Sequence, residues 1–271
     1  MSEPFAIDGA TRIYPIIGDP IAQVKSPAGM TAAFVAAGRN AAVIPIHVPP
    51  ADVDDFIRTV GRTRNVDGLI VTIPHKFAAL SHCATMSERA RIVGSVNVLR
   101  RNPDGSWHGD NIDGLGMLGG IRSQGGDPMG RKTLLVGAGG AGMAIAQTLL
   151  ESGASELAIH DVDAARRDRL VARMRAHYGE RARVGSDDPS GFELVVNATP
   201  MGMRPDDPPP VRTDRLAAGT FVGCVITAPA VSPWVAEARA RGCRGSVGTD
   251  MYRAEQGLMI DFFLEAAMAE A

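Results

Sequence analysis

The feature of this chain that most constrains its fold is a glycine-rich turn between two apolar segments. The stretch TLLVGAGGAGMAIAQTLL, which starts at Thr133, passes from a strand-like run through Gly137, Gly139, Gly140 and Gly142 into a helix-like run. One glycine permits a tight turn, another lets the backbone approach a pyrophosphate, and the last allows helix and strand to pack closely. The amino end of the helix then faces the phosphate charge. This context of strand, glycines and helix predicts a dinucleotide-binding turn.

An acidic residue, Asp161, stands directly after the next strand-like run, ELAIH. An acid at that point can bind both ribose hydroxyls of NAD and would repel the 2′-phosphate of NADP. The alternative is an ordinary aspartate that helps to cap the following helix. Arg166 and Arg167 lie nearby in the sequence, where either could reach a 2′-phosphate. We expect NAD as the cofactor, with NADP as the alternative.

Strand-like and helix-like segments alternate along the whole chain, which predicts an α/β fold with a mostly parallel sheet and helices on both faces. The runs SVNVLRR and WHGDNI flank a turn signal at 102–105 and indicate a β-hairpin. The glycines between Gly119 and Gly130 indicate a boundary between two units. Arginines between Arg166 and Arg183 alternate with apolar residues, which predicts the exposed face of an amphipathic helix.

The bulk composition argues against several classes of function. A net charge of -2 in 271 residues gives no general attraction to nucleic acid or to an anionic membrane. Three scattered cysteines are too few for a disulfide framework, and none has a partner at metal-ligand spacing. The first residues lack the pattern of a signal peptide, and no apolar run approaches the length of a membrane span. We therefore expect a cytoplasmic protein, a monomer or homodimer, that binds neither metal, nucleic acid nor membrane.

A second unusual stretch is GLIVTIPHKF, which begins at Gly68. Its apolar run predicts a buried strand, and Thr72 and Lys76 follow at the carboxyl end, where α/β sheets bind ligands. Lys76 is therefore a candidate for contact with a ligand. The alternative is that Pro74 simply ends the strand and Lys76 is a solvated residue of the next helix.

Six motifs then occur in a fixed order along the chain: GDPIAQVKSP, VTIPHK, GSVNVL, GDNIDG, VGAGGAG and NATPMGM. With these motifs the chain closely resembles the shikimate/quinate dehydrogenase family over almost its whole length. The resemblance implies an NAD(P)-dependent enzyme that interconverts a secondary alcohol and a ketone on shikimate, quinate or a related polyhydroxylated cyclic acid. It implies an N-terminal α/β domain that binds the substrate, at 1–113, and a Rossmann-type doubly wound parallel sheet, at 114–245. A C-terminal helix, at 246–271, is expected to return to the first domain.

The same resemblance assigns roles to individual residues. Lys76 and Asp113 match the catalytic pair that faces across the substrate and moves the proton of its hydroxyl group. His75 is a competing candidate for the base, although no partner for a hydrolase relay stands near it in the sequence. Substrate contacts are implied for Ser26, Thr72, Asn97, Asp113, Thr227 and Glu255. Cofactor contacts are implied for Glu88, Gly137, Gly139, Gly140, Ala141, Gly142, Asp161, Thr199, Met201, Val225 and Gly248.

Three departures from the family pattern concern the substrate. The family has two serines in the first loop, and here the first position is Val24, which leaves Ser26 alone. Thr227 stands where the family has a tyrosine, and Glu255 stands where it has a glutamine, with Gln256 one residue later. Because the catalytic pair is retained, these changes predict an enzyme with an altered substrate preference. The alternative hypothesis is a nucleotide-binding sensor that has lost turnover.

Overall fold

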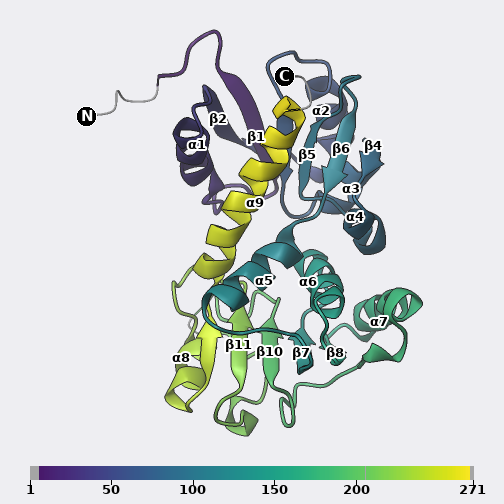
Figure 1. The fold of residues 1–271 in the computed structure, drawn as a ribbon, viewed down its shortest axis with the longest axis vertical. Helices are drawn as coiled ribbons and strands as arrows, with labels where there is room; N and C mark the ends of the chain where they lie inside the picture. The colour runs from purple at the N-terminus through teal and green to yellow at the C-terminus, as the bar shows by residue number, and fades with distance from the viewer. Residues whose placement is uncertain (1–5, 205, 269–271) are drawn as a thin grey trace. The chain divides into compact units, whose positions relative to one another are not determined.

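The structure is a computed structural model that describes residues 6–204 and 206–268 (Figure 1). The chain divides into two compact units, and each is built around a six-stranded sheet. The first unit holds the residues up to Ile112 and those from Gln256 onward, and the second unit is Asp113–Glu255. The helix α9 (Gly248–Met268), yellow in Figure 1, therefore contributes its beginning to one unit and its remainder to the other.

The first unit is a mixed sheet with short helices. Its strands are β1 (Arg12–Gly18), β2 (Ala41–His47), β3 (Gly68–Val71), β4 (Cys83–Met86), β5 (Val98–Arg101) and β6 (Trp107–Asp110), in the order β2-β1-β3-β5-β6-β4. Its helical segments are α1 (Ser26–Ala36), η1 (Pro50–Asp52), α2 (Val53–Val60), α3 (Lys76–Leu80) and α4 (Glu88–Val93). β5 and β6 pair antiparallel, so the predicted hairpin is confirmed. The strand β4 was not expected, because it is only four residues long and none of its side chains is buried.

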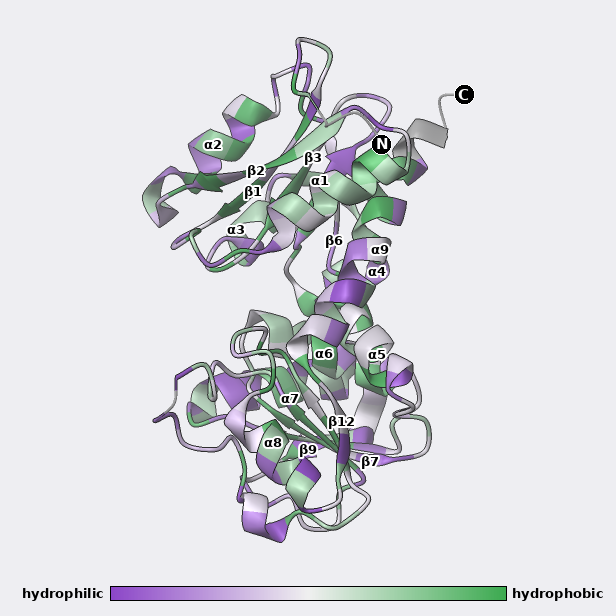
Figure 2. Cartoon of the chain, turned by 90° about the vertical axis from the view of Figure 1, so that its left-hand side faces the viewer, coloured by the Kyte–Doolittle hydropathy of each residue, from purple (hydrophilic) through white to green (hydrophobic). Residues whose placement is uncertain are grey.

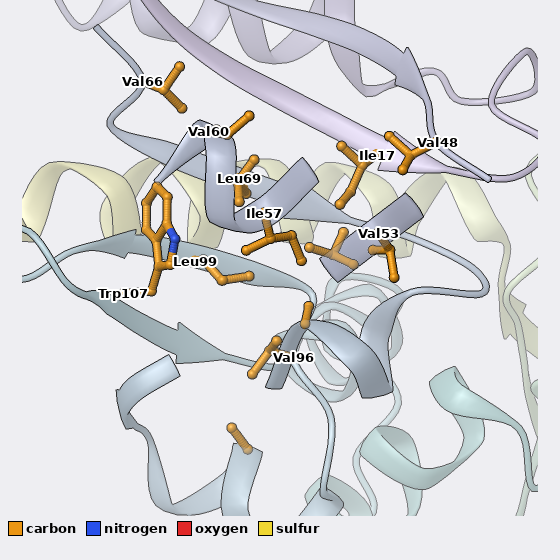
Figure 3. Packing of buried hydrophobic residues seen from close by; sticks show 13 residues of the cluster. Ile17, Val48, Val53, Ile57, Val60, Val66, Leu69, Val96, Leu99 and Trp107 are labelled. Carbon is orange, nitrogen blue, oxygen red and sulfur yellow. The ribbon is translucent and has the colours of Figure 1, made fainter. Parts of the chain in front are cut away.

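An apolar cluster fixes α2 on one face of this sheet (Figure 3). The helix presents Val53, Ile57 and Val60, spaced at i, i+4 and i+7, so they share one face. They pack against strand residues that include Leu69 and Leu99, both fully buried. Burying each such side chain contributes about 1.5–3 kcal/mol. The opposite face of α2 is polar, and Figure 2 shows the helix banded in green and purple.

The second unit is a wholly parallel sheet. Its strands are β7 (Lys132–Val136), β8 (Glu156–His160), β9 (Ala182–Val184), β10 (Leu194–Asn197), β11 (Phe221–Cys224) and β12 (Arg244–Ser246), in the order β12-β11-β10-β7-β8-β9. Its other segments are α5 (Asp113–Ser123), α6 (Gly140–Glu151), α7 (Ala164–Tyr178), η2 (Gly179–Arg181), η3 (Thr213–Arg215), α8 (Pro233–Ala240) and the start of α9. The strand order reverses between β7 and β10. This is the doubly wound arrangement expected from the sequence, and such sheets bind ligands where the order reverses.

Two expectations from the sequence need correction in this unit. The arginine-rich helix ends at Tyr178, so Arg181 lies in η2 and Arg183 in β9. Gly179, with φ at +63°, stops the helix in a backbone conformation that a side chain would disfavour. Gly119, expected in a boundary loop, is instead inside the helix α5.

The glycines of α5 are packing sites for neighbouring helices of the second unit. A Cβ atom on Gly119 would lie 2.6 Å from Cβ of Ala254, and one on Gly120 would lie 2.8 Å from the backbone nitrogen of Met251. Both contacts are closer than real Cβ atoms make, so only glycine allows the start of α9 to approach α5 this closely. This packing explains why the part of α9 up to Glu255 belongs to the second unit.

Candidate active site

In the first unit, the loop after β3 presents Thr72 and Lys76. The backbone nitrogen of Thr72 donates to the carbonyl of Ile17 at 2.9 Å, which continues the sheet pairing by one residue. Gly18 leaves room for the Thr72 side chain, because a Cβ on Gly18 would lie 2.5 Å from Cγ2 of Thr72. Lys76 is the first residue of α3 and is buried, so it is not the solvated helix residue of the alternative interpretation. Its carbonyl accepts the Val96 N–H at 3.0 Å.

His75, the competing candidate for the base, is fully buried. Its Nε2 lies 2.7 Å from the carbonyl oxygen of Val48. A carbonyl can only accept, so Nε2 carries the hydrogen and donates it. This bond ties the loop after β3 to the end of β2. The contact gives His75 a structural role next to Lys76.

Asn97 is held by the chain segment that leads to Asp113. Its Oδ1 accepts the backbone N–H of Ile112 at 2.9 Å, and its own backbone carbonyl accepts the Val71 N–H at 2.7 Å. Asp113, buried at the start of α5, directly follows Ile112 in the chain.

The two polar residues before Ile112 support this loop. Asp110 accepts from Nε of Arg89 at 2.8 Å, from the Ser87 hydroxyl and from the Asn111 backbone N–H. Nδ2 of Asn111 donates to Oγ of Ser95 at 3.0 Å. Both side chains are buried, so these motif residues shape the loop. A polar residue in a motif suits either role, so the sequence alone does not separate these two residues from ligand-binding residues.

The remaining first-unit candidates lie at helix starts. Ser26 begins α1, and Val24 before it packs against the apolar cluster that contains Tyr14 and Met30. Val24 therefore contributes to the core as well as lacking a hydroxyl. Glu88 begins α4, where its exposed carboxylate forms an ion pair with Arg91.

In the second unit, the glycines after β7 differ in the space that surrounds each of them. Gly137 has φ of +104°, and a Cβ there would lie 2.8 Å from the backbone carbon of Ala198, the residue that follows β10. A Cβ on Gly142 would overlap the carbonyl oxygen of Gly137, so α6 and β7 approach closely. A Cβ on Gly139 meets nothing within 4 Å. Open space thus lies beside Gly139, next to the amino end of α6, where Gly140 and Ala141 begin the helix.

Asp161 holds the backbone of this turn. Its Oδ2 accepts the Ala138 N–H at 2.7 Å, and its Oδ1 accepts the Asp163 N–H at 2.9 Å. Asp163, not Asp161, caps α7, since its side chain accepts the Arg166 N–H. That bond lowers the pKa of Asp163. Asp161 is thus buried and bonded to the glycine turn, with the fully exposed Val162 beside it.

Arg166 and Arg167 already have acidic neighbours. Arg166 lies 3.4 Å from Asp163 and 3.9 Å from Asp161, and Nε of Arg167 donates to Asp168 at 2.8 Å. A 2′-phosphate at the end of β8 would therefore meet two acidic side chains and an arginine whose charge they partly neutralise.

The loop after β10 is organised by Asn197, which is buried. Its Oδ1 accepts from the backbone N–H of Thr199 at 3.0 Å and from the Thr199 hydroxyl at 2.6 Å, and its Nδ2 donates to the carbonyl of Met201 at 3.1 Å. The Asn197 carbonyl accepts the Val225 N–H at 3.1 Å. Gly248 packs so closely on the chain after β11 that a Cβ would overlap the Ile226 carbonyl.

Two candidates for substrate contact that depart from the family pattern, Thr227 and Glu255, belong to the second unit. Thr227 is half-buried in the loop that follows β11. The carboxyl group of Glu255 lies over Gly116 of α5, where a Cβ would be 2.9 Å from Oε1. Gln256 does not take the place of a glutamine at 255, because its Nε2 donates to the Gly29 carbonyl at 2.6 Å within the first unit.

Within residues 6–204 and 206–268, no cluster of three or more His, Cys, Asp or Glu side chains is placed to hold a metal ion. No helix in that part of the chain has the length and apolar character needed to cross a membrane.

These features define a class, a two-unit α/β protein with a dinucleotide-binding turn in one unit and a buried lysine after a core strand in the other. Residues 16–99 match the family model described as the shikimate dehydrogenase substrate binding domain. The shikimate dehydrogenase (NADP(+)) of Rubrobacter xylanophilus is 35% identical over 263 residues, 95% of this chain and 92% of that protein. The chain therefore belongs to the shikimate/quinate dehydrogenase family and is an oxidoreductase of that type.

Solved structures agree with this assignment. The quinate dehydrogenase of Corynebacterium glutamicum, in complex with NAD, is 27% identical with a TM-score of 0.85, over 93% of each chain. The ligand-free 5-ketofructose reductase of a Gluconobacter species is also 27% identical with a TM-score of 0.85, over 94% of this chain and 93% of that one.

The glycine turn gives a direct test of its geometry. In Gly142→Ala the new methyl meets the backbone oxygen of Gly137, which cannot move aside cheaply. We expect overpacking of about 1–3 kcal/mol and a fall in Tm of roughly 2–10 °C. Gly139→Ala, whose methyl meets nothing and whose φ of -76° suits alanine, is the matched control and should unfold like the wild type. Equal Tm values for the two variants would contradict the packing described for Gly142.

Proposed function

We propose that this protein is an NAD-dependent dehydrogenase that interconverts a secondary alcohol and a ketone on a polyhydroxylated substrate whose recognition does not require a carboxylate. The first unit binds the substrate through Ser26, Thr72 and Asn97, and the second unit binds the dinucleotide. Lys76 and Asp113 are the catalytic residues. Membership of the shikimate/quinate dehydrogenase family supports the reaction, and the environment of Val24 supports the change in substrate.

Lys76 serves as the proton carrier in this proposal. Oxidation of a secondary alcohol removes a hydride from carbon and a proton from the hydroxyl, and a lysine amine next to that hydroxyl can exchange the proton. In the direction of reduction, the ammonium group gives its proton to the forming alkoxide. Asp113 is proposed to accept a hydrogen bond from a substrate hydroxyl. Thr72 and Asn97 hold further hydroxyl groups, which positions the reacting carbon.

The second unit offers what a dinucleotide requires. Backbone N–H groups at the amino end of α6 face the open space beside Gly139, which suits a pyrophosphate. When the dinucleotide is bound, its nicotinamide would supply or accept the hydride. Thr199, Met201 and Val225 follow the ends of β10 and β11 and are proposed to hold the nicotinamide portion. Because Gly139→Ala places a methyl group in the phosphate space, we expect it to weaken NAD binding without loss of stability.

The proposed substrate class rests above all on Val24. A serine hydroxyl at this position could donate to a carboxylate, whereas Val24 packs into an apolar cluster and offers no donor. Glu255 adds an acidic group in place of the amide that the family resemblance implies. The Gluconobacter relative is named for 5-ketofructose, a polyhydroxylated ketone without a carboxylate, which shows that a similar chain is associated with such a compound.

Replacement of Lys76 tests the catalytic assignment. The substrate panel consists of shikimate, quinate and neutral polyhydroxylated alcohols. In Lys76→Ala we expect kcat on the best substrate of this panel to fall by about 10²-fold or more, because general acid–base groups contribute about 10²–10⁴-fold. The NAD dissociation constant should stay nearly unchanged, since the glycine turn lies in the other unit. Steady-state NADH production, combined with single-turnover kinetics, measures the chemical step.

Lys132→Ala is the matched control, because Lys132 is an exposed residue at the start of β7. A single-turnover rate of Lys76→Ala close to that of the wild type would show that Lys76 does not carry the proton. Tight NAD binding by a wild type that turns over no panel member would instead favour the sensor hypothesis.

The preference for NAD follows from the acids at the end of β8. We expect the wild-type kcat/KM to be higher with NAD than with NADP, because Asp161 and Asp163 would repel the 2′-phosphate. Val162 is 96% exposed between them, so Val162→Arg should leave the fold intact and raise kcat/KM with NADP by roughly tenfold through a charge-assisted bond. Val162→Gln controls for side-chain length. A wild type that is more efficient with NADP would overturn the assignment.

The carboxylate site is tested by restoring the missing hydroxyl. A hydrogen bond to a charged group is worth about 1.5–3 kcal/mol, so its absence should cost roughly ten- to a hundredfold in kcat/KM for shikimate and quinate. We expect Val24→Ser to recover several-fold of this loss. Val24→Ala removes the same packing without adding a donor and should recover nothing. An equal effect of the two substitutions would mean that packing, and not the hydroxyl, controls acid substrates.

A further inference from the structure

The sulfur of Cys224, the last residue of β11, is surrounded by polar groups although it is only 1% exposed. Nε1 of Trp234 donates to it at 3.4 Å, and Nδ2 of Asn197 donates at 3.6 Å. The hydroxyl oxygen of Ser232 lies 3.6 Å away, with either atom able to donate. Three segments therefore meet at one buried thiol: the end of β10, the end of β11 and the start of α8.

The groups around the sulfur determine the direction of two of its three hydrogen bonds. A cysteine has one weak S–H donor and a sulfur that accepts weakly. The amide nitrogen of Asn197 and the indole nitrogen of Trp234 are donors only, so the sulfur accepts from both. Between Sγ and the Ser232 hydroxyl, either atom can be the donor. A valine or alanine at 224 would leave the Trp234 N–H without this acceptor and would remove one partner of the Asn197 amide.

The Asn197 amide is the link to the loop that follows β10. One of its donors binds the Met201 carbonyl, the other binds Cys224, and its oxygen binds Thr199 twice. The contact with the sulfur therefore helps to determine the rotation of the amide plane. A rotated amide would release the Thr199 N–H, the Met201 carbonyl or both.

We propose that Cys224 is a positioning residue for cofactor binding, which acts through Asn197 to hold the loop 198–201 in the form that contacts the dinucleotide. This inference rests on the proposed function insofar as Thr199 and Met201 contact the cofactor. The competing explanation is that Cys224 only fills space, because it also belongs to the apolar cluster that contains Trp234 and Val235. Both explanations predict some loss of stability on substitution, so stability cannot separate them.

The experiment compares substitutions at the two buried cysteines of this cluster. Cys224→Val keeps an apolar side chain of similar size and removes the acceptor, whereas Cys224→Ser keeps a donor and an acceptor. Cys243→Val is the matched control, because Cys243 is buried in the same cluster and its thiol donates to the Ala217 carbonyl. Two quantities are measured for each variant. The first is amide hydrogen exchange without nucleotide at Thr199, whose N–H Asn197 accepts, and at Met201, whose N–H donates to Oγ1 of Thr199. The second is the dissociation constant of NAD.

In Cys224→Val we expect exchange at Thr199 and Met201 to accelerate about tenfold and the NAD dissociation constant to rise about five- to tenfold, with the substrate KM little changed. Cys224→Ser should recover most of both losses, and Cys243→Val should show neither. Unchanged exchange and unchanged NAD affinity in Cys224→Val would overturn the proposal and leave Cys224 as a space-filling residue.

The two readouts also separate this inference from the proposed function. Faster exchange in Cys224→Val with no NAD binding by the wild type would support the link from Cys224 to the loop while contradicting the cofactor role of the second unit. Normal exchange together with weaker NAD binding would contradict the route through Asn197. If Cys224→Val unfolds, Cys224→Ser is compared with the wild type instead. The serine oxygen is nearer its Cβ than the sulfur is, so it lies farther from the Asn197 amide, and exchange should be somewhat faster than in the wild type.

Discussion

A buried side-chain oxygen accepts a backbone N–H in the loops that carry the candidate functional residues. Asn97 accepts from Ile112, Asp161 from Ala138 and Asp163, and Asn197 from Thr199. Buried backbone N–H groups without a partner are costly, and loops lack the regular pairing of helices and strands. These asparagines and aspartates supply the missing partners at the carboxyl ends of strands. The positions of Ile112 before Asp113, of the glycine turn and of Thr199 depend on them.

The sequence was most informative where backbone geometry allowed one residue type. Gly137 and Gly142 are constrained by a positive φ and by close backbone approach, so their spacing predicted the turn and, with the strand alternation, the doubly wound sheet. It was least informative about short or exposed elements. β4 has no buried side chain to create a pattern, and the arginines of η2 and β9 continue the composition of α7 without continuing its helix.

The sequence was also ambiguous about the polar residues within motifs. Asp110, Asn111 and Asn197 could not be told from ligand-binding residues, because only their hydrogen-bond partners reveal a structural role. Asp161 is a further example: the sequence predicts a ribose contact, and the structure shows one bond from the glycine turn, at Ala138, and one from the N-cap residue of α7, Asp163. The sequence shows Val24 where the family resemblance implies a serine, but only the structure shows that this side chain packs against an apolar cluster.

The residues proposed for catalysis and those proposed to contact the substrate differ in this chain. Lys76, Asn97 and Asp113 match the pattern that the sequence resemblance implies, whereas Val24, Thr227 and Glu255 depart from it. We propose that this difference moves the preference away from cyclic acids. Its most direct measurement is the wild-type kcat/KM with NADH or NAD on matched compounds, shikimate and quinate against 5-ketofructose and other neutral polyhydroxylated ketones and alcohols. We predict that a neutral compound is used at least tenfold more efficiently than either acid. A kcat/KM for shikimate near 10⁶ M⁻¹s⁻¹, within the usual range of enzymes on their own substrates, with neutral compounds far below it, would contradict the account.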